Sequence, residues 1–244
     1  MARKAQTPKA PTARTSAAKT LTVAGIARRQ LQVILALDCS GSMRGDRIAS
    51  LNYAMRTALP ELRHVAADNP EIDVRLRVLR FGSTAQWHVA EPRPVDELKW
   101  SDLTADGATH MGEALRMIAE VLTPEAMPGR QLPPVIVLAS DGCPTDDVDG
   151  GLKAFFEAPN AASSIRLAIA IGSDADHEVL ERFIAHPTMK PLKATNASDL
   201  VHQIKWATTA PVKAASSPTN APDPLVPLAR EADLAPSANS EIIW

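Results

Sequence analysis

Three short segments of the sequence carry closely spaced oxygen side chains next to glycine. The first is DCSGS at residues 38–42, the second is DGAT at residues 106–109, and the third is SDG at residues 140–142. Carboxylate and hydroxyl oxygens are hard ligands that suit Mg²⁺, with Mn²⁺ or Ca²⁺ as the competing ions. The sequence therefore predicts a divalent metal site, provided that the three segments meet in the fold.

The chain around these segments alternates apolar strands with amphipathic helices. Residues 31–37, 135–139 and 165–171 are aliphatic at nearly every position, which is typical of parallel strands covered on both faces. Apolar residues recur at helical spacing from Ile48 to Val65 and from Met111 to Leu122. This alternation predicts an α/β fold, a doubly wound, Rossmann-like three-layer sandwich with a mainly parallel sheet.

Further elements complete the predicted sandwich. Residues 72–81 alternate in part between apolar and charged side chains, which indicates a strand near a sheet edge, and residues 85–90 are expected to return antiparallel as the edge strand. Pro60 predicts a kink or a break near Leu59, and Thr145 is the expected N-cap of a helix at residues 146–157. The remaining expected elements are a surface loop at 95–108, a helix at 178–185, a strand at 191–194 and a helix at 197–206.

The predicted topology brings the three segments to one place. Ligands in open α/β sheets bind outside the carboxyl ends of the strands. The first and third segments directly follow predicted strands, and the second precedes the helix that begins near His110. Two carboxylates would balance the ion's charge while neutral hydroxyls donate little, so the ion stays electrophilic and an acidic group of a partner could fill its open position.

Composition limits the partners and the setting. The 244 residues are 45% hydrophobic, which suits one globular domain, and the net charge of −2 gives no general reason to expect nucleic acid or an anionic membrane as a partner. Cys39 and Cys143 are too few for a disulfide scaffold, and they are interpreted as small buried residues in tight loops rather than a redox pair. No apolar run has the length of a membrane span. We expect a cytoplasmic protein without nucleic acid or membrane partners.

Both ends of the chain have the composition of disordered segments. Residues 1–30 contain Lys and Arg but no acid, which predicts a solvated basic tail, with a transit peptide or a nucleic-acid arm as alternatives. Residues 207–244 are rich in Ala, Pro and Ser and are also predicted to be disordered. Their last residues, Ile242 to Trp244, are either a docking peptide or simply the chain end. The folded domain is therefore predicted to span residues 31–206.

The order of the motifs resembles a known family. Asp38-x-Ser40-x-Ser42, followed by Thr109 and then by Asp141, resembles the metal-ion-dependent adhesion site of von Willebrand factor A (VWA) domains over about residues 31–206. The resemblance implies the VWA fold and a Mg²⁺-dependent protein–protein interaction module that captures an Asp or Glu of its partner. It also implies that the two serines and the threonine bind the ion directly, and that the two aspartates bind it directly or through water.

A narrower resemblance concerns the bacterial tellurium-resistance TerY-like group of VWA domains. It is carried by DCSGSM at residues 38–43, GAT at 107–109 and SDGCPTDD at 140–147. Ala108 stands where a glycine is frequent in this group, and Cys39 where threonine is frequent. The resemblance implies a bacterial stress or tellurite-resistance signalling system, with a protein kinase or a PP2C-type phosphatase as partners.

Two other functions were weighed against the binding module. A Mg²⁺-dependent phosphohydrolase is the main alternative, because acid-ended strands also build phosphatase sites. However, position 40 is serine where a haloacid-dehalogenase enzyme has its second Asp, and Arg44 is one residue too close to Cys39 for a Cys-x5-Arg loop. The third reading is a metal-free scaffold whose site is empty under cellular conditions. Taken alone, the Asp38-x-Ser40-x-Ser42 motif could also simply cap the following helix. The sequence favours a binding module that is not an enzyme.

Overall fold

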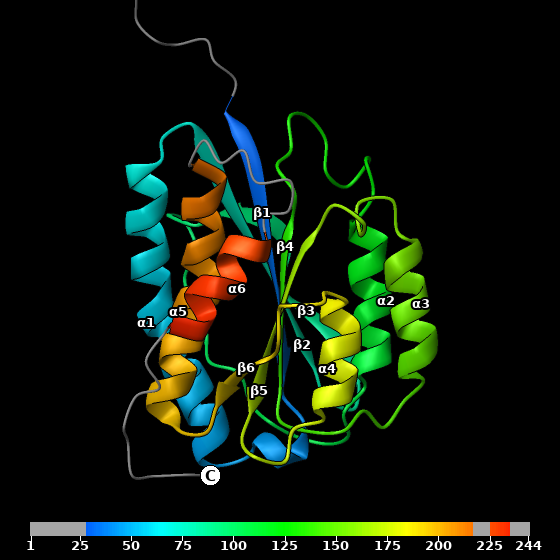
Figure 1. The fold of residues 1–244 in the computed structure, drawn as a ribbon. Helices are drawn as coiled ribbons and strands as arrows, with labels where there is room; N and C mark the ends of the chain where they lie inside the picture. Colours follow the sequence, from blue (N-terminus) through cyan, green and yellow to red (C-terminus); the bar gives the residue numbers. More distant parts are fainter. Residues whose placement is uncertain (1–27, 217–224, 235–244) are drawn as a thin grey trace, which may run out of the picture.

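A computed structural model of the chain describes residues 28–216 and 225–234. Six strands form one central sheet, which lies between two layers of helices (Figure 1). The strands are β1 (Arg29–Asp38), β2 (Ile72–Phe81), β3 (Ala85–Pro94), β4 (Val135–Ser140), β5 (Ile165–Ile171) and β6 (Leu192–Ala194). The helices are the 3-10 turn η1 (Gly41–Met43), α1 (Asp46–Asp68), α2 (Met111–Val121), α3 (Val148–Glu157), α4 (His177–Ile184), α5 (Ala197–Ser216) and α6 (Leu225–Leu234).

The sheet has the strand order β3-β2-β1-β4-β5-β6. All neighbouring strands are parallel except β2 and β3, which are antiparallel, so β3 is the antiparallel edge strand. Helices α1, α5 and α6 lie on one face of the sheet, and α2, α3 and α4 lie on the other (Figure 1). The predicted doubly wound α/β sandwich is therefore confirmed, although β3 extends to Pro94 rather than ending near residue 90.

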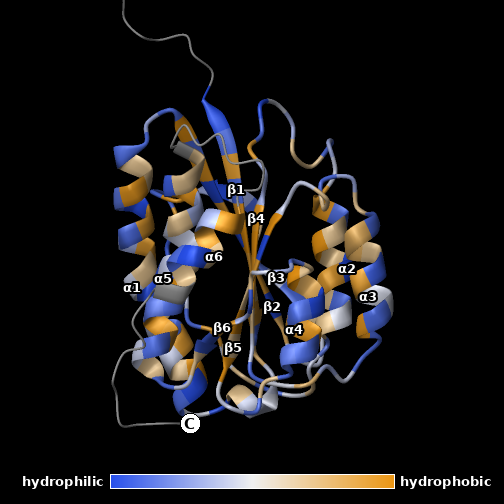
Figure 2. Ribbon diagram, viewed as in Figure 1, coloured by the Kyte–Doolittle hydropathy of each residue, from blue (hydrophilic) through white to orange (hydrophobic). Residues whose placement is uncertain are grey.

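The core consists of the central strands and the inner faces of the helices. Every residue of β4 is buried, and β1 is buried from Leu31 to Asp38. The strands form a hydrophobic centre, while hydrophilic residues lie on the outer faces of the helices (Figure 2). Because burial of apolar surface from both sides fixes these strands, the loops that follow β1 and β4 start from rigid positions.

The structure bears on two local predictions. Helix α1 continues through Pro60, which excludes a break near Leu59 and leaves the kink as a prediction. Because Pro60 and Arg56 are exposed, water can hydrate the Arg56 carbonyl group, which loses its amide partner. The N-cap of α3 is Asp147 rather than Thr145, since the Asp147 side chain accepts a hydrogen bond from the Gly150 amide at 3.0 Å. In addition, β1 begins at Arg29, inside the predicted N-terminal tail.

The C-terminal boundary also differs from the prediction. Helix α5 continues past residue 206 to Ser216, and α6 covers Leu225–Leu234, so the predicted disorder of residues 207–244 is wrong for both segments. Their apolar residues are buried against the domain: Ala207, Ala210, Val212, Leu225, Leu228 and Ala229. The alanine content that resembles a linker thus also supplies small residues for helix packing. The predictions for residues 1–27 and for Ile242 to Trp244 lie outside the described residues.

Candidate metal centre

The carboxylate of Asp38 lies at the end of β1 and is fully buried. Its Oδ1 accepts a hydrogen bond from the Ser40 amide at 2.8 Å, and its Oδ2 accepts one from the Ser140 hydroxyl at 2.5 Å. Ser140 is the last residue of β4, which pairs in parallel with β1. The two central strands therefore end together and hold this carboxylate in place.

The serines of the first segment lie at the turn that follows β1, at the bottom of the view in Figure 1. The hydroxyl oxygens of Ser40 and Ser42 are 2.9 Å apart, and the Ser42 hydroxyl donates to Oδ1 of Asp141 at 2.8 Å. Asp141 directly follows β4 and is buried. The first and third segments are thus joined through their side-chain oxygens.

The hydroxyl of Thr109, from the second segment, lies near Gly142 of the third segment, as the Ser42 hydroxyl does. A Cβ atom placed on Gly142 would lie 3.5 Å from Ser42 Oγ and 3.8 Å from Thr109 Oγ1. Hydroxyls from the first and second segments therefore lie over the backbone of the third. The structure brings together all five predicted ligand residues, whereas Asp106 of the second segment is exposed and forms an ion pair with Arg44.

Backbone contacts hold the second segment against the first. The Gly41 amide donates to the Gly107 carbonyl at 2.8 Å, and the Asp106 amide donates to the Cys39 carbonyl at 2.7 Å. Gly107 has φ +82°, and a Cβ atom there would lie 1.9 Å from Ser83 Oγ. Only glycine fits this close approach without displacing the loop.

The loop between β4 and α3 holds Thr109 in place. Thr145 accepts a hydrogen bond from the Thr109 amide through its hydroxyl at 3.0 Å, and its own amide donates to the Thr109 carbonyl at 2.9 Å. The Asp146 carboxylate accepts hydrogen bonds from the amides of Gly112 and Glu113, at 2.9 and 2.8 Å. Thr145 and Asp146 therefore stabilise the start of α2 rather than that of α3.

Asn52 is a positioning residue that the sequence analysis missed. It lies on α1 and is 5% exposed. Its Nδ2 donates to the Leu103 carbonyl at 2.9 Å, and its Oδ1 accepts from the Leu103 amide at 2.8 Å. This pair of bonds fastens the loop between β3 and α2, which carries Thr109, to the helix that follows the serines. The sequence signal that could have identified Asn52 is its amide side chain, which stands next to the apolar stripe of α1.

Arg47 is the second missed residue, and it supplies a positive charge. Its Nη1 donates to Oδ2 of Asp141 at 2.6 Å, and its Nη2 donates to Oδ1 of Asp174 at 2.9 Å. Partial burial acts to lower the pKa of Arg47, but the hydrogen bonds to Asp141 and Asp174 outweigh it and raise that pKa. The Asp141 carboxylate of the site is therefore paired with the Arg47 guanidinium.

Asp38 has a different electrostatic environment. Among the residues that the structure describes, no cation forms a salt bridge with it. Burial raises the pKa of Asp38 from 3.8 to about 6, hydrogen bonds from Ser140 and Ser40 act to lower it, and the charge of Asp141 adds to the increase. At neutral pH the site thus contains a buried, ionised carboxylate without a cation partner, which is costly unless a positive charge is bound.

The donor set fits a hard divalent ion. The five residues offer two carboxylates and three hydroxyls, which suit Mg²⁺ and leave coordination positions for water or a partner. Within residues 28–216 and 225–234, no group of three or more His, Cys, Asp or Glu side chains could hold a metal, so the hydroxyls are essential to any metal site here.

The two cysteines near the site differ in burial. Both are free; Cys39 is buried as expected, whereas Cys143 is exposed, so the prediction of a buried loop residue is wrong for Cys143. Burial, together with the charge of Asp38, raises the pKa of the Cys39 thiol to about 12, so this thiol is neutral at physiological pH. Cys39 is therefore not an activated nucleophile.

The sequence profile of the von Willebrand factor type A (VWA) domain matches residues 32–206. The chain therefore belongs to the VWA family, whose domains commonly mediate protein–protein interaction or adhesion. A comparison with curated protein sequences found no match. None of the helices in the described part of the chain has the length and apolar character needed to cross a membrane.

Solved structures with the same fold come from diverse organisms. A von Willebrand factor type A protein from Catenulispora acidiphila has a TM-score of 0.55 at 16% identity, with 75% of this chain and 42% of that chain covered. The ArnB paralog VWA2 from Sulfolobus acidocaldarius has a TM-score of 0.52 at 15% identity, with 73% and 45% covered. The pilus adhesin SpaC from Lactobacillus rhamnosus GG has a TM-score of 0.59 at 13% identity, with 76% and 30% covered. The chain thus spans less than half of each of these structures.

Proposed function

We propose that this chain is a Mg²⁺-dependent protein–protein interaction module that captures an Asp or Glu side chain of its partner. The observation that carries the proposal is the convergence of oxygen side chains from three segments beside Asp38, a buried carboxylate without a cation partner in the described part of the chain. A bound divalent ion would supply the missing positive charge and a position for a carboxylate from another protein.

The residues of the chain have distinct roles in this proposal. Ser40, Ser42 and Thr109 would offer neutral oxygens to the ion, and Asp38 and Asp141 would balance its charge. Because Asp38 is fixed by Ser140 and by the Ser40 amide, it presents its carboxylate without side-chain rearrangement. A low total negative charge leaves the ion able to attract a further carboxylate.

We also propose that the module is not an enzyme. The Cys39 thiol beside Asp38 is not an activated thiolate, because it is buried and its pKa is raised to about 12. A partner carboxylate in the open position would itself act as a ligand rather than as a substrate. A bacterial stress or tellurite-resistance context in the cytoplasm, with a protein kinase or a PP2C-type phosphatase as partner, is the more detailed proposal, and it is supported by the resemblance of the three motifs.

Affinity capture from a cell extract tests the proposal. The wild-type chain and the Asp38→Asn variant would serve as baits in Mg²⁺ and in EDTA, with captured proteins identified by mass spectrometry. The expected partner is retained only by the wild type in Mg²⁺, and an Asp→Asn or Glu→Gln change in that partner removes its binding. Partners that bind equally to both baits and in EDTA would contradict the proposal.

A further inference from the structure

Arg47 links the candidate metal centre to a loop that the ligand motifs do not include. The guanidinium group contacts Asp141, the last of the five predicted ligand residues, and Asp174 in the loop between β5 and α4. The side chain of Asp141 is fully buried, that of Arg47 is 15% exposed, and that of Asp174 is 59% exposed. The cation therefore lies between a buried acid of the site and an acid at the surface.

The backbone around Asp174 leaves space for this arrangement. Gly172 has φ +83°, and a Cβ atom at this position would lie 2.7 Å from Asp174 Oδ1 and 2.8 Å from Arg47 Nη2. A side chain at position 172 would push the two charged groups apart. The contact between Arg47 and Asp174 thus depends on the glycine at position 172, in the loop between β5 and α4.

We propose that Arg47 competes with the metal ion for Asp141, and that Asp174 weakens this competition by holding part of the guanidinium group, so that the Arg47–Asp174 pair sets the metal affinity. The inference rests on the proposed function, because it presupposes that an ion binds beside Asp141. It assigns a role to two residues outside the ligand set.

Electrostatics gives the two residues opposite effects. The charge of Arg47 repels a divalent cation and neutralises Asp141, and both effects weaken metal binding. Asp174 draws one side of the guanidinium toward the surface and adds a negative charge near the centre. In the absence of the ion, Arg47 instead stabilises the domain, because Asp141 would otherwise be a second buried carboxylate without a cation.

The opposite effects of Arg47 and Asp174 on Mg²⁺ affinity can be measured by calorimetry. The purified full-length chain is titrated with Mg²⁺ alone at pH 7.5. Arg47→Gln is expected to bind Mg²⁺ on the order of tenfold more tightly than wild type, and Asp174→Asn about threefold more weakly. Arg47→Lys retains the positive charge but not the fork that bridges the two acids, and it is expected to bind Mg²⁺ more weakly than Arg47→Gln. High salt should reduce the difference between the variants, since it screens the exposed Asp174 most strongly.

Thermal melting in EDTA provides the second measurement. Arg47→Gln is expected to melt about 5 °C or more below wild type without metal, and saturating Mg²⁺ should reduce this gap. If Arg47 only positions Asp141, both Arg47→Gln and Asp174→Asn would weaken Mg²⁺ binding, and this common direction would overturn the inference while leaving the proposed function intact. If neither wild type nor Arg47→Gln binds Mg²⁺, the inference and the proposed function fail together.

Discussion

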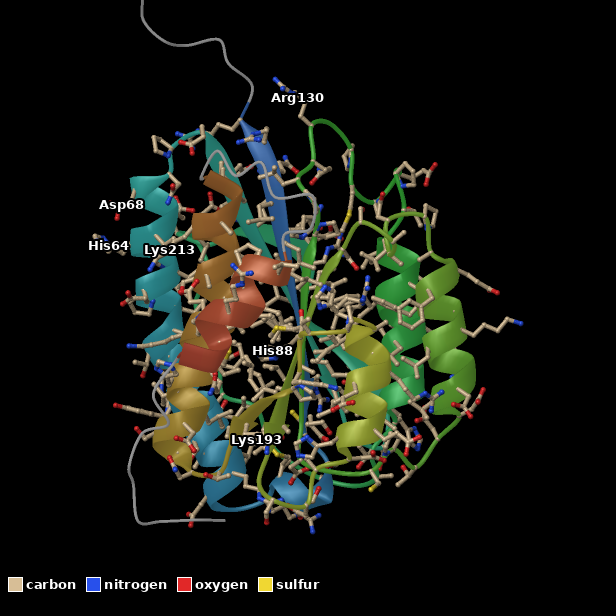
Figure 3. All side chains as sticks on the ribbon, in the orientation of Figure 1. His64, Asp68, His88, Arg130, Lys193 and Lys213 are labelled. Atoms are coloured by element: carbon tan, nitrogen blue, oxygen red, sulfur yellow. The ribbon has the colours of Figure 1, made fainter. Side chains whose placement is uncertain are left out.

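The two ends of the sheet differ in character: the carboxyl end has buried carboxylates, and the opposite end has two cavities. At the carboxyl end, Asp38 and Asp141 are buried and accept hydrogen bonds from a backbone amide and from serine hydroxyls. The opposite end, where Arg130 is labelled in Figure 3, has a cavity of about 400 Å³ beside Pro124, Gln131 and Ser163. A smaller cavity of about 180 Å³ lies at that same end, beside Arg63 and other residues near the start of β2.

Cavity volume and unbalanced charge therefore point to different ends of the sheet. The larger cavity is lined by proline, aliphatic and amide side chains, and the smaller one is lined by both cationic and acidic side chains, among them Arg63 and Asp73. The carboxyl end instead concentrates charge that the protein does not fully balance, since Asp38 lacks a cation partner among the described residues. Charge without compensation is a stronger indication of a small-ion site than space is.

The largest expected effect comes from exchanging the Asp38 carboxylate for an amide, and a matched exchange at the opposite end of the sheet serves as its control. Asp38→Asn should weaken Mg²⁺ binding by at least about 100-fold, because the ion loses one of its two charged ligands. At pH 7.5 without metal, the same change should raise the free energy of unfolding by up to about 3 kcal/mol, since it removes the cost of an ionised carboxylate with a raised pKa.

Asp73→Asn is the matched change at the opposite end. Asp73 lines the smaller cavity and pairs with Arg75 at 2.7 Å. Its loss should leave Mg²⁺ binding unchanged and alter the free energy of unfolding by less than about 1 kcal/mol. Calorimetric titration and urea denaturation measure both variants, and equal effects of the two changes on Mg²⁺ affinity would break the distinction between the ends.

The pH dependence of stability sharpens the same distinction. Because the pKa of Asp38 is about 6 in the folded chain and 3.8 as the ordinary value, the folded state binds more protons than the unfolded state between these values. The contribution of Asp38 to stability without metal should therefore fall by about 2 kcal/mol as the pH rises from 4 to 7, and it stays constant above that range.

Asp38→Asn serves as the reference for this experiment. Urea denaturation of both proteins in EDTA between pH 5 and pH 7.5 isolates the contribution of Asp38, because other carboxylates titrate equally in the two chains. Saturating Mg²⁺ should suppress the decline in the wild type, since the ion binds the ionised form. Parallel pH profiles of the two proteins in EDTA would show that burial of Asp38 carries no such cost.

A smaller effect is expected from Asn52, whose hydrogen bonds to Leu103 hold the loop that carries the second segment. Asn52→Leu leaves the buried amide and carbonyl of Leu103 without their partner, which should cost about 2 kcal/mol of stability. Mg²⁺ affinity should fall about tenfold as the loop carrying Thr109 loosens. The matched control is Asn160→Leu at the opposite end, where Asn160 Nδ2 donates a weak hydrogen bond to Met127 Sδ at 3.6 Å, and where no loss of Mg²⁺ affinity is expected.

Much of the fold could be predicted from the sequence because its signals are local. Aliphatic strands that end in Asp38 and in Ser140-Asp141 identify both the parallel sheet and the edge where the three segments meet. The spacing of Ser40 and Ser42 also predicts their common direction, since a tight turn brings the two hydroxyls within 2.9 Å.

Other features depend on contacts between distant parts of the chain. Arg47 and Asn52 look like ordinary helix residues, and their roles become visible only when α1 lies beside residues 141 and 103. The helical part of residues 207–244 was missed because Ala and Pro content favours a linker, whereas burial of Val212 and Leu228 against the domain stabilises helices there. Tertiary packing therefore overrides local composition at these positions.

Crystals soaked with Mn²⁺ and measured for anomalous scattering would show directly whether a divalent ion binds at the candidate metal centre. Mn²⁺ is chosen because it accepts the same oxygen ligands as Mg²⁺ and can be located unambiguously by its anomalous signal. We predict one peak within ligand distance of the Ser40, Ser42 and Thr109 hydroxyl oxygens, which is absent from Asp38→Asn crystals soaked in the same way. A wild-type crystal without a peak at this position, or with Mn²⁺ bound only elsewhere on the surface, would contradict the account.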